Sequence, residues 1–327
     1  CNTISMRSMS FMPLIIQIGG INMKTITLNN TNLSIPEIGM GCMRIVELEN
    51  VDAVKGWVDT ALEHGINFFD HADIYGKGRC EELFGQVLTP SLREKIILQS
   101  KCSIRPGIAF DFSKEHILNS VDGILKRLNT EYLDILLLHR PDALMEPEEV
   151  ADAFRILKES GKVRHFGVSN QTPMQMELLS KYCDEPLLIN QLQLSIAHCP
   201  MINSGINANM YNDSGINRDG GVLEYCRLKD ITIQAWSPFQ YGMFEGIFLG
   251  NEKFAELNKV IDNLAEKYNV TNSAIAVAWI LRHPAGIQTI VGTTNKDRIA
   301  QISKASEIRL TREEWYALYM AAGNKLP

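Results

Sequence analysis

The sequence lacks the signatures of several large classes of protein. It has no block of lysine and arginine, and its formal net charge of −6 over 327 residues argues against a nucleic-acid partner. The apolar segment near its amino terminus, FMPLIIQIGGI, is too short to cross a bilayer, so we expect no membrane partner. With 45% apolar and 21% charged residues, the composition is that of a globular protein with a large core.

Paired cysteines and glycine-rich phosphate loops are also missing. The seven cysteines are scattered without any C-x-x-C pair, which favours a reducing, cytoplasmic location over a disulfide framework or a zinc site. His71, His165 and His198 lack the spacing of metal ligands, so no metal is expected. No G-x-G-x-x-G follows a predicted strand, because GMGCMR at Gly39 has only two glycines. A Rossmann dehydrogenase is therefore disfavoured.

The amino-terminal segment is unusual because the chain starts at Cys1, whereas MKTITLNN from Met23 has the character of a natural beginning. We treat residues 1–22 as an uninformative amino-terminal extension. No linker, repeat or low-complexity tract divides the rest, so one domain is predicted over residues 23–327.

Short apolar runs alternate with longer amphipathic segments through the whole chain. Eight of the runs read as strands: IPEIGMG, NFFD, KIILQSK, YLDILLLH, RHFGVS, LLINQLQ, ITIQAW and QTIVG. Seven amphipathic segments read as helices: Val51–His64, Arg79–Leu88, Ser113–Leu128, Pro147–Ser160, Pro173–Tyr182, Gly221–Arg227 and Glu252–Tyr268. Continuous apolar strands are typical of a parallel sheet covered on both faces. The pattern predicts an α/β fold, a (β/α)8 TIM barrel.

Three further features complete this predicted architecture. TITLNNTNLS reads as an amino-terminal β-hairpin ahead of the first barrel strand. Two long loops, His198–Gly221 and Pro238–Phe254, follow strands and should lie at the carboxyl-terminal face, where barrel enzymes build their sites. The last helix begins with a capping box at Thr311.

Ionisable side chains stand at the ends of three consecutive predicted strands. Asp70, Lys101 and His139 end strands two, three and four, and Tyr75 lies in the loop after strand two. Each alone has a simpler interpretation: Lys101 as a side chain reaching solvent, His139 as a half-buried histidine, Tyr75 as packing. Together they suit proton transfer, because an ammonium group beside a tyrosine lowers its pKa and a carboxylate keeps that ammonium charged.

Motifs around these residues resemble those of the aldo-keto reductases, over essentially all of residues 23–327. FFDHADIYG matches the family's D-x-A-x-x-Y-G signature, LLLHRPD its histidine motif and GKVRHFGVSN its third signature. The resemblance implies a catalytic tetrad of Asp70, Tyr75, Lys101 and His139, with Tyr75 as general acid.

The same resemblance implies an extended dinucleotide across the barrel mouth. The nicotinamide carboxamide would be held by Ser169, Asn170 and Gln191, with Trp236 stacked on the ring. By themselves, Ser169 and Asn170 read equally well as a turn before the helix at Thr172. The remaining candidate cofactor-binding residues would contact the pyrophosphate, the 2′-phosphate or the adenine: Ser237, Phe239, Gly292, Thr293, Thr294, Arg298 and Gln301.

Two positions depart from the family pattern at the expected 2′-phosphate site. Gly292 stands where many members carry a lysine, and Ile302 where many carry an asparagine. Lys296 is close enough in sequence to replace the missing charge. NADPH is the expected cofactor, and NADH is the second candidate.

The function expected from this resemblance is NADPH-dependent reduction of an aldehyde or ketone, a small-molecule carbonyl substrate. The closest likeness is to bacterial oxidoreductases of the family. The alternative is a redox-sensing regulatory subunit of the same fold. A barrel hydrolase or isomerase would need paired carboxylates or metal ligands at the strand ends. Only Asp70 and Asp142 are near, so this function is disfavoured. The sequence does not indicate the oligomeric state.

Overall fold

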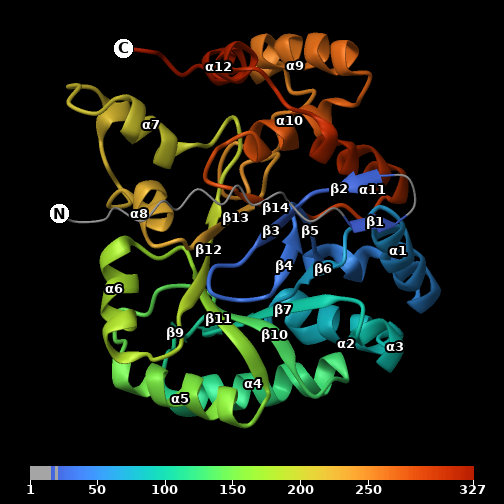
Figure 1. The fold of residues 1–327 in the computed structure, drawn as a ribbon, viewed down its shortest axis with the longest axis vertical. Helices are drawn as coiled ribbons and strands as arrows, with labels where there is room; N and C mark the ends of the chain where they lie inside the picture. Colours follow the sequence, from blue (N-terminus) through green and yellow to red (C-terminus); the bar gives the residue numbers. More distant parts are fainter. Residues whose placement is uncertain (1–15, 19–20) are drawn as a thin grey trace, which may run out of the picture.

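A closed barrel of eight parallel strands forms the centre of the computed structural model, which describes residues 16–18 and 21–327 (Figure 1). Around the barrel the strand order is β5, β6, β7, β10, β11, β12, β13 and β14, and β14 pairs with β5. Their bounds are β5 (Ile38–Gly41), β6 (Phe68–Asp70), β7 (Ile97–Cys102), β10 (Leu133–Leu138), β11 (Val163–Ser169), β12 (Leu187–Gln193), β13 (Thr232–Trp236) and β14 (Gln288–Val291). The predicted TIM barrel is confirmed, and each predicted strand contributes one barrel strand.

Helices surround the barrel and cover its outer face (Figure 1). Their bounds are α1 (Val51–Glu63), α2 (Arg79–Val87), α3 (Pro90–Arg93), α4 (Lys114–Leu128), α5 (Pro147–Glu159), α6 (Pro173–Tyr182), α7 (Pro200–Ile206), α8 (Val222–Leu228), α9 (Ala255–Tyr268), α10 (Asn272–Leu281), α11 (Lys296–Ser303) and α12 (Arg312–Ala321). The capping box at Thr311 is present, with Glu314 as its partner, and starts α12.

The sequence analysis missed helix α10, for a physical reason. Every residue from Ala274 to Ile280 is buried, so this helix has no polar face and no amphipathic period to detect. Helix α7 was also missed, because it lies within the segment 198–221 that was predicted as a loop. Part of that segment therefore has regular structure.

A β-hairpin closes the amino-terminal end of the barrel. Its strands β3 (Thr25–Thr27) and β4 (Ser34–Pro36) pair antiparallel, as predicted. Leu28 and Ile35 are fully buried and belong to one apolar cluster with Phe68, Ile97 and other inward-facing barrel residues. The barrel interior is therefore sealed at this end by apolar packing.

Two shorter hairpins lie outside the barrel. Strands β8 (Ile104–Arg105) and β9 (Ala109–Phe110) form one, and β1 (Ile16–Ile18) and β2 (Ile21–Met23) form the other. Met23 is the last residue of β2, so the boundary expected at residue 23 falls inside a strand. Most of the predicted extension, residues 1–15 and 19–20, lies outside the described residues. Among the residues that are described, no helix is long and apolar enough to cross a membrane.

The glycines of GMG have a packing role in β5. A Cβ atom at Gly39 would lie 2.9 Å from side-chain atoms of both Ile290 and Phe68. Only glycine fits between the inward-facing side chains of the neighbouring strands at this point. The motif thus serves barrel closure, which agrees with the absence of a phosphate-binding loop there.

Candidate active site

Asp70, Lys101 and Tyr75 form a hydrogen-bonded group at the carboxyl-terminal end of β6 and β7. The Nζ atom of Lys101 lies 2.8 and 2.7 Å from the two carboxylate oxygens of Asp70, and it donates to the Tyr75 hydroxyl oxygen at 3.2 Å. It also donates to the main-chain carbonyl of His71 at 2.9 Å. Lys101 is fully buried and Asp70 is 2% exposed, so this ion pair is shielded from solvent.

The charge of Lys101 is maintained by its partners. Burial alone would lower the pKa of Lys101, but the Asp70 carboxylate and the Tyr75 hydroxyl outweigh burial, and the net shift is upward. A permanent ammonium group therefore faces the phenol oxygen.

Tyr75 departs from the expectation of a lowered pKa. Burial raises the pKa of Tyr75, and this effect outweighs the lowering by the Lys101 charge. The sequence reasoning considered the lysine and not the loss of water around the phenol, so the predicted net direction was wrong. The direction found suits a proton donor, because the phenol stays protonated at neutral pH while Lys101 can stabilise the phenolate after the proton leaves.

His139 lies beside this group, at the end of β10. Its ring centroid is 6.0 Å from that of Tyr75, with the rings at 84°. Its backbone N–H donates to Ser103 Oγ at 3.1 Å, which fixes the start of the loop after β10. Burial, and then the charges of Lys101 and Arg140, hold the pKa of His139 well below its usual value. The imidazole is therefore neutral and can donate a hydrogen bond without adding charge.

A layer of buried glutamines lies directly beneath the tetrad, and the sequence analysis missed it. The glutamine layer consists of Gln99, Gln191, Gln234 and Gln288, on β7, β12, β13 and β14. Gln99 Nε2 donates to Asp70 Oδ1 at 2.6 Å and to Gln234 Oε1 at 2.9 Å.

The other members extend this network across the barrel. Gln234 Nε2 donates to Gln99 Oε1 at 3.2 Å and to Gln288 Oε1 at 2.8 Å, and Gln288 Nε2 donates to the carbonyl of Pro36 at 2.7 Å. Gln191 Nε2 donates to Gln234 Oε1 at 2.8 Å. The barrel interior is therefore polar at this level. The signal was present, because the runs ILQSK, NQLQ, TIQAW and QTIV each carry a glutamine.

The residues expected at the nicotinamide lie together at the mouth. Ser169 Oγ donates to the carbonyl of Gln191 at 2.9 Å, and Asn170 Nδ2 donates to Ser169 Oγ at 2.8 Å. Trp236 Nε1 donates to Asn170 Oδ1 at 3.2 Å, and the guanidinium of Arg140 lies 5.7 Å from the Trp236 ring centroid. Sequence reasoning missed Arg140. Ser237 follows with a positive φ of 52°, and Phe239 is half-buried against the core.

The residues expected at the 2′-phosphate lie around the start of α11. Thr293 is buried, and its carbonyl accepts from Trp57 Nε1 at 2.9 Å. Thr294 is half-buried and precedes Asn295, whose side chain caps the helix by accepting from the Arg298 N–H at 3.0 Å. Arg298 and Gln301 are exposed one turn apart, on the same face of α11. This arrangement offers a guanidinium and a helix amino terminus to an anion.

The structure shows the surroundings of the two departures from the family pattern, Ile302 and Gly292, and of Lys296. Ile302 is fully buried in the core, so it cannot reach a bound adenine. The Nζ atom of Lys296 lies directly over Gly56 of α1, where a Cβ atom would collide with it. At Gly292 an added Cβ would meet no atom within 4 Å, so open space lies beside this residue.

This geometry defines an acid–base site at the mouth of a barrel. No group of three His, Cys, Asp or Glu residues in the described part of the chain could hold a metal ion. The donors needed for a dinucleotide are present: an amide and hydroxyl cluster at one side of the mouth, and an exposed arginine on a capped helix at the other.

Known proteins resemble this chain along most of its length. The model of the aldo/keto reductase family matches residues 37–321. The uncharacterized oxidoreductase YcsN of Bacillus subtilis is 37% identical over 86% of this chain and 92% of its own length. A 6-dehydroglucose reductase of Novosphingobium aromaticivorans is 33% identical over 92% of this chain and 96% of its own length.

Solved structures show the same fold. The thermostable aldo-keto reductase Tm1743, in complex with the inhibitor epalrestat, superposes with a TM-score of 0.73 and 26% identity, over 91% of this chain and 99% of that one. The chain belongs to the aldo/keto reductase family. It is therefore an NAD(P)H-dependent oxidoreductase.

Proposed function

We propose that the protein reduces an aldehyde or ketone to an alcohol with NADPH, and that Tyr75 is the proton donor. The observation that carries this proposal is the 3.2 Å hydrogen bond between Lys101 Nζ and the Tyr75 hydroxyl, with Asp70 paired behind the lysine. When bound, NADPH supplies the hydride that adds to the carbonyl carbon. The protein must then supply one proton to the carbonyl oxygen.

Tyr75 meets the requirements for that proton transfer. Its raised pKa keeps the phenol protonated at neutral pH before the reaction. Negative charge develops on the phenol oxygen as its proton moves to the substrate oxygen, and the adjacent ammonium of Lys101 stabilises that charge. Asp70 holds the ammonium in place through both carboxylate oxygens. The neutral imidazole of His139 is placed to donate a hydrogen bond to the same substrate oxygen and to orient it.

The cofactor would lie across the mouth, from Trp236 to α11. Ser169, Asn170 and Gln191 would hold the carboxamide, and the Trp236 indole, fixed by Asn170, would stack on the nicotinamide ring. Ser237 and Phe239 would border the pyrophosphate. Gly292, Thr293, Thr294, Arg298 and Gln301 would hold the adenosine 2′-phosphate end. Arg298 supports NADPH over NADH because a guanidinium matches a phosphate with two parallel hydrogen bonds.

The loops at the mouth indicate an apolar part in the substrate. Leu144, in the loop after β10, is 86% exposed, and Met243 and Phe244, in the loop after β13, are 52% and 69% exposed. Apolar side chains exposed around a polar site are typical of a surface that a ligand covers. We therefore propose a small carbonyl compound with an apolar part as the substrate class.

Turnover of a carbonyl panel tests the proposal. Purified protein is mixed with NADPH or NADH and with a series of aldehydes and ketones, and the absorbance of the nucleotide is followed. The series includes 6-dehydroglucose, because two relatives are named 6-dehydroglucose reductase. We expect NADPH consumption that depends on the carbonyl, and Tyr75→Phe should lower kcat by at least roughly a hundredfold while NADPH still binds.

Two results would contradict it. A Tyr75→Phe variant with near wild-type kcat would remove Tyr75 as the donor. Tight NADPH binding without turnover of any carbonyl would favour the redox-sensing regulatory role instead.

A further inference from the structure

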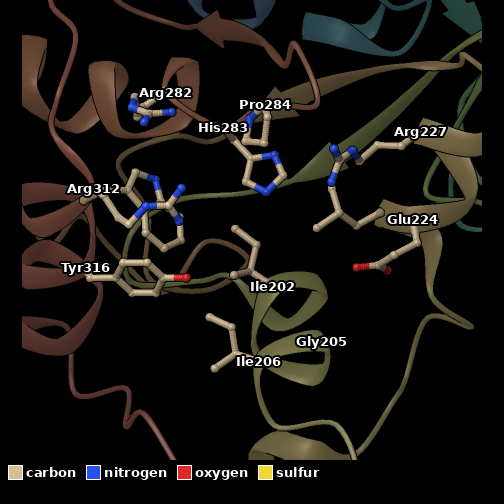
Figure 2. A pocket seen from close by; sticks show the side chains of 12 residues that line it. Ile202, Gly205, Ile206, Glu224, Arg227, Arg282, His283, Pro284, Arg312 and Tyr316 are labelled. Atoms are coloured by element: carbon tan, nitrogen blue, oxygen red, sulfur yellow. The ribbon is translucent and has the colours of Figure 1, made fainter.

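A cavity of about 340 Å³ lies outside the barrel, between α7 and α8 on one side and the ends of α10 and α12 on the other. Figure 2 shows the side chains of these four elements facing one another across it. Helices α8 and α10 lead directly into strands β13 and β14, so their carboxyl-terminal ends lie on the side of the barrel away from the mouth. None of the lining residues belongs to the tetrad or to the expected nucleotide site.

Three arginines line this cavity: Arg227 at the end of α8, Arg282 at the end of α10 and Arg312 at the start of α12 (Figure 2). Within the described part of the chain, none of the three forms an ion pair. Glu224 also lines the cavity, but it pairs with none of them among the described residues. The three guanidinium groups outnumber the single carboxylate of Glu224, so the cavity is positively charged in a chain whose overall charge is negative.

Arg282 is held in a fixed position. Its Nε atom donates to the carbonyl of Leu310 at 2.7 Å, and its side chain is half-buried. A guanidinium fixed through Nε keeps its two terminal amino groups available as donors. Arg227 and Arg312 are exposed, so their side chains can adjust to a ligand.

His283 adds a neutral donor to the same wall. Its Nδ1 accepts the backbone N–H of Ala285 at 3.2 Å, which assigns the proton of the neutral ring to Nε2. Burial, and then the charges of Arg227 and Arg282, lower the pKa of His283 to about 4. At neutral pH the ring is therefore uncharged, and it can donate a hydrogen bond to an anion.

The aromatic side chains of Trp315 and Tyr316, on α12, form another wall of the cavity. The Trp315 ring stacks on Trp279 at 4.8 Å with an interplanar angle of 7°, and each indole donates to the other residue's carbonyl, at 3.0 and 3.1 Å. Tyr316 packs edge-on against Trp315 at 4.9 Å. Figure 2 shows the Tyr316 hydroxyl directed into the cavity, opposite Ile202 and Ile206 of α7.

We propose that this cavity binds a small amphipathic carboxylate, with its carboxylate between Arg227, Arg282 and Arg312 and its apolar body against α7 and the aromatic wall of α12. The volume is at the lower end of the roughly 300–1,000 Å³ of ligand pockets, which limits the ligand to a small molecule. Arginine forks match a planar carboxylate with paired hydrogen bonds. Aromatic and branched side chains supply contact area for a ring or short chain.

Calorimetric titration of the full-length protein with 2-naphthoate tests the proposal, and neutral 2-naphthamide serves as its uncharged counterpart. The informative variants are Arg227→Gln and Arg312→Gln, because both side chains are exposed and neither change should affect folding. Arg309→Gln is the matched control, since Arg309 is exposed and lies outside the cavity lining.

We expect 2-naphthoate to bind the wild type and Arg309→Gln equally, and 2-naphthamide to bind at least roughly tenfold more weakly. Arg227→Gln and Arg312→Gln should each weaken 2-naphthoate by roughly tenfold, and the double variant should weaken it further. Turnover with NADPH should be the same in all of these variants.

Three outcomes would overturn the proposal. They are no binding of 2-naphthoate at millimolar concentration, equal binding of the amide, and binding that is unchanged in Arg227→Gln and Arg312→Gln. The last outcome would mean that the carboxylate binds elsewhere on the protein.

Discussion

The side-chain amide nitrogen of Gln99 lies 2.6 Å from Asp70 Oδ1, so a neutral buried residue donates a hydrogen bond to the carboxylate that pairs with Lys101. The side chain of Gln99 bonds to Asp70 and Gln234 and not to Tyr75, so it is a positioning residue in the proposed mechanism. The same amide also bonds to Gln234, which fixes its orientation. The direction of the Asp70 carboxylate thus depends on the barrel interior as well as on Lys101.

Gln99→Leu should lower kcat by roughly tenfold and stability by roughly 1–3 kcal/mol. Asp70 Oδ1 would keep only its bond from Lys101, and Gln234 would lose one of its donors and one of its acceptors. Gln288→Leu is the matched control, since Gln288 belongs to the same layer but bonds to Pro36 and Gln234, not to Asp70. It should cost similar stability with little change in kcat. Steady-state kinetics and urea denaturation measure both. Equal losses of kcat in the two variants would mean that the layer acts on folding alone.

Lys101→Met should remove the ammonium group that lowers the pKa of Tyr75, so that pKa should rise further. The high-pH limb of kcat, where Tyr75 loses its proton, should then move to higher pH while kcat falls. The unpaired Asp70 should also cost roughly 3–5 kcal/mol of stability. The pH profile of kcat measures the first effect, with Lys95→Met, an exposed lysine, as the control. An unshifted limb would disprove the coupling of Lys101 to Tyr75.

Arg298→Ala should weaken NADPH by roughly tenfold and leave NADH nearly unchanged, because an exposed guanidinium contributes about 1.5 kcal/mol to a phosphate contact. The absence of a lysine at Gly292 keeps this preference small. Lys296→Ala should change neither affinity, since its ammonium group lies over Gly56 of α1. Fluorescence titration with both nucleotides tests these expectations. Equal weakening of NADPH and NADH by Arg298→Ala would make NADH a serious candidate.

Asp73→Asn should stabilise the protein at high pH. Burial, and then the nearby Glu81 carboxylate, raise the pKa of Asp73 to about 7, while Arg127 and Lys101 act in the opposite direction more weakly. The folded chain thus holds a proton that the unfolded chain releases near its ordinary pKa of about 3.9, so wild-type stability falls as the pH rises between these values. The gain from asparagine should reach roughly 1–3 kcal/mol at about pH 8 and largely vanish at about pH 4. Thermal denaturation at both pH values measures it, and a gain independent of pH would contradict the assignment.

The strands, and the proximity of the candidate catalytic residues, were predictable from sequence because their signals are local. Runs such as ILQSKC and LDILLL are buried along their whole length, and Lys101 and His139 stand at or just after the ends of such runs. Parallel strands bring those ends to one edge, so their proximity follows from the order of the elements. The placement of Asp70 beside Lys101 required no further information.

Other features depend on long-range packing that no local pattern records. Helix α10 is buried on every side, so its composition resembles that of a strand. The bonds of the glutamine layer join residues far apart in the sequence, such as Gln99 and Gln234, which are separated by 135 positions, and Gln288 and Pro36, which are separated by 252. The direction of the Tyr75 pKa depends on how much water its surroundings exclude, which the residue types alone do not determine.

The hairpin of β3 and β4 affects how water can enter and leave the barrel interior. Because Leu28 and Ile35 close one end of the barrel with buried apolar side chains, the mouth is the open end of the barrel interior in the described part of the chain. Any water that leaves the neighbourhood of the glutamine layer must use the opening that the substrate enters. A nucleotide seated across that opening would confine such water, so hydration of the barrel interior and residence of the nucleotide would change together.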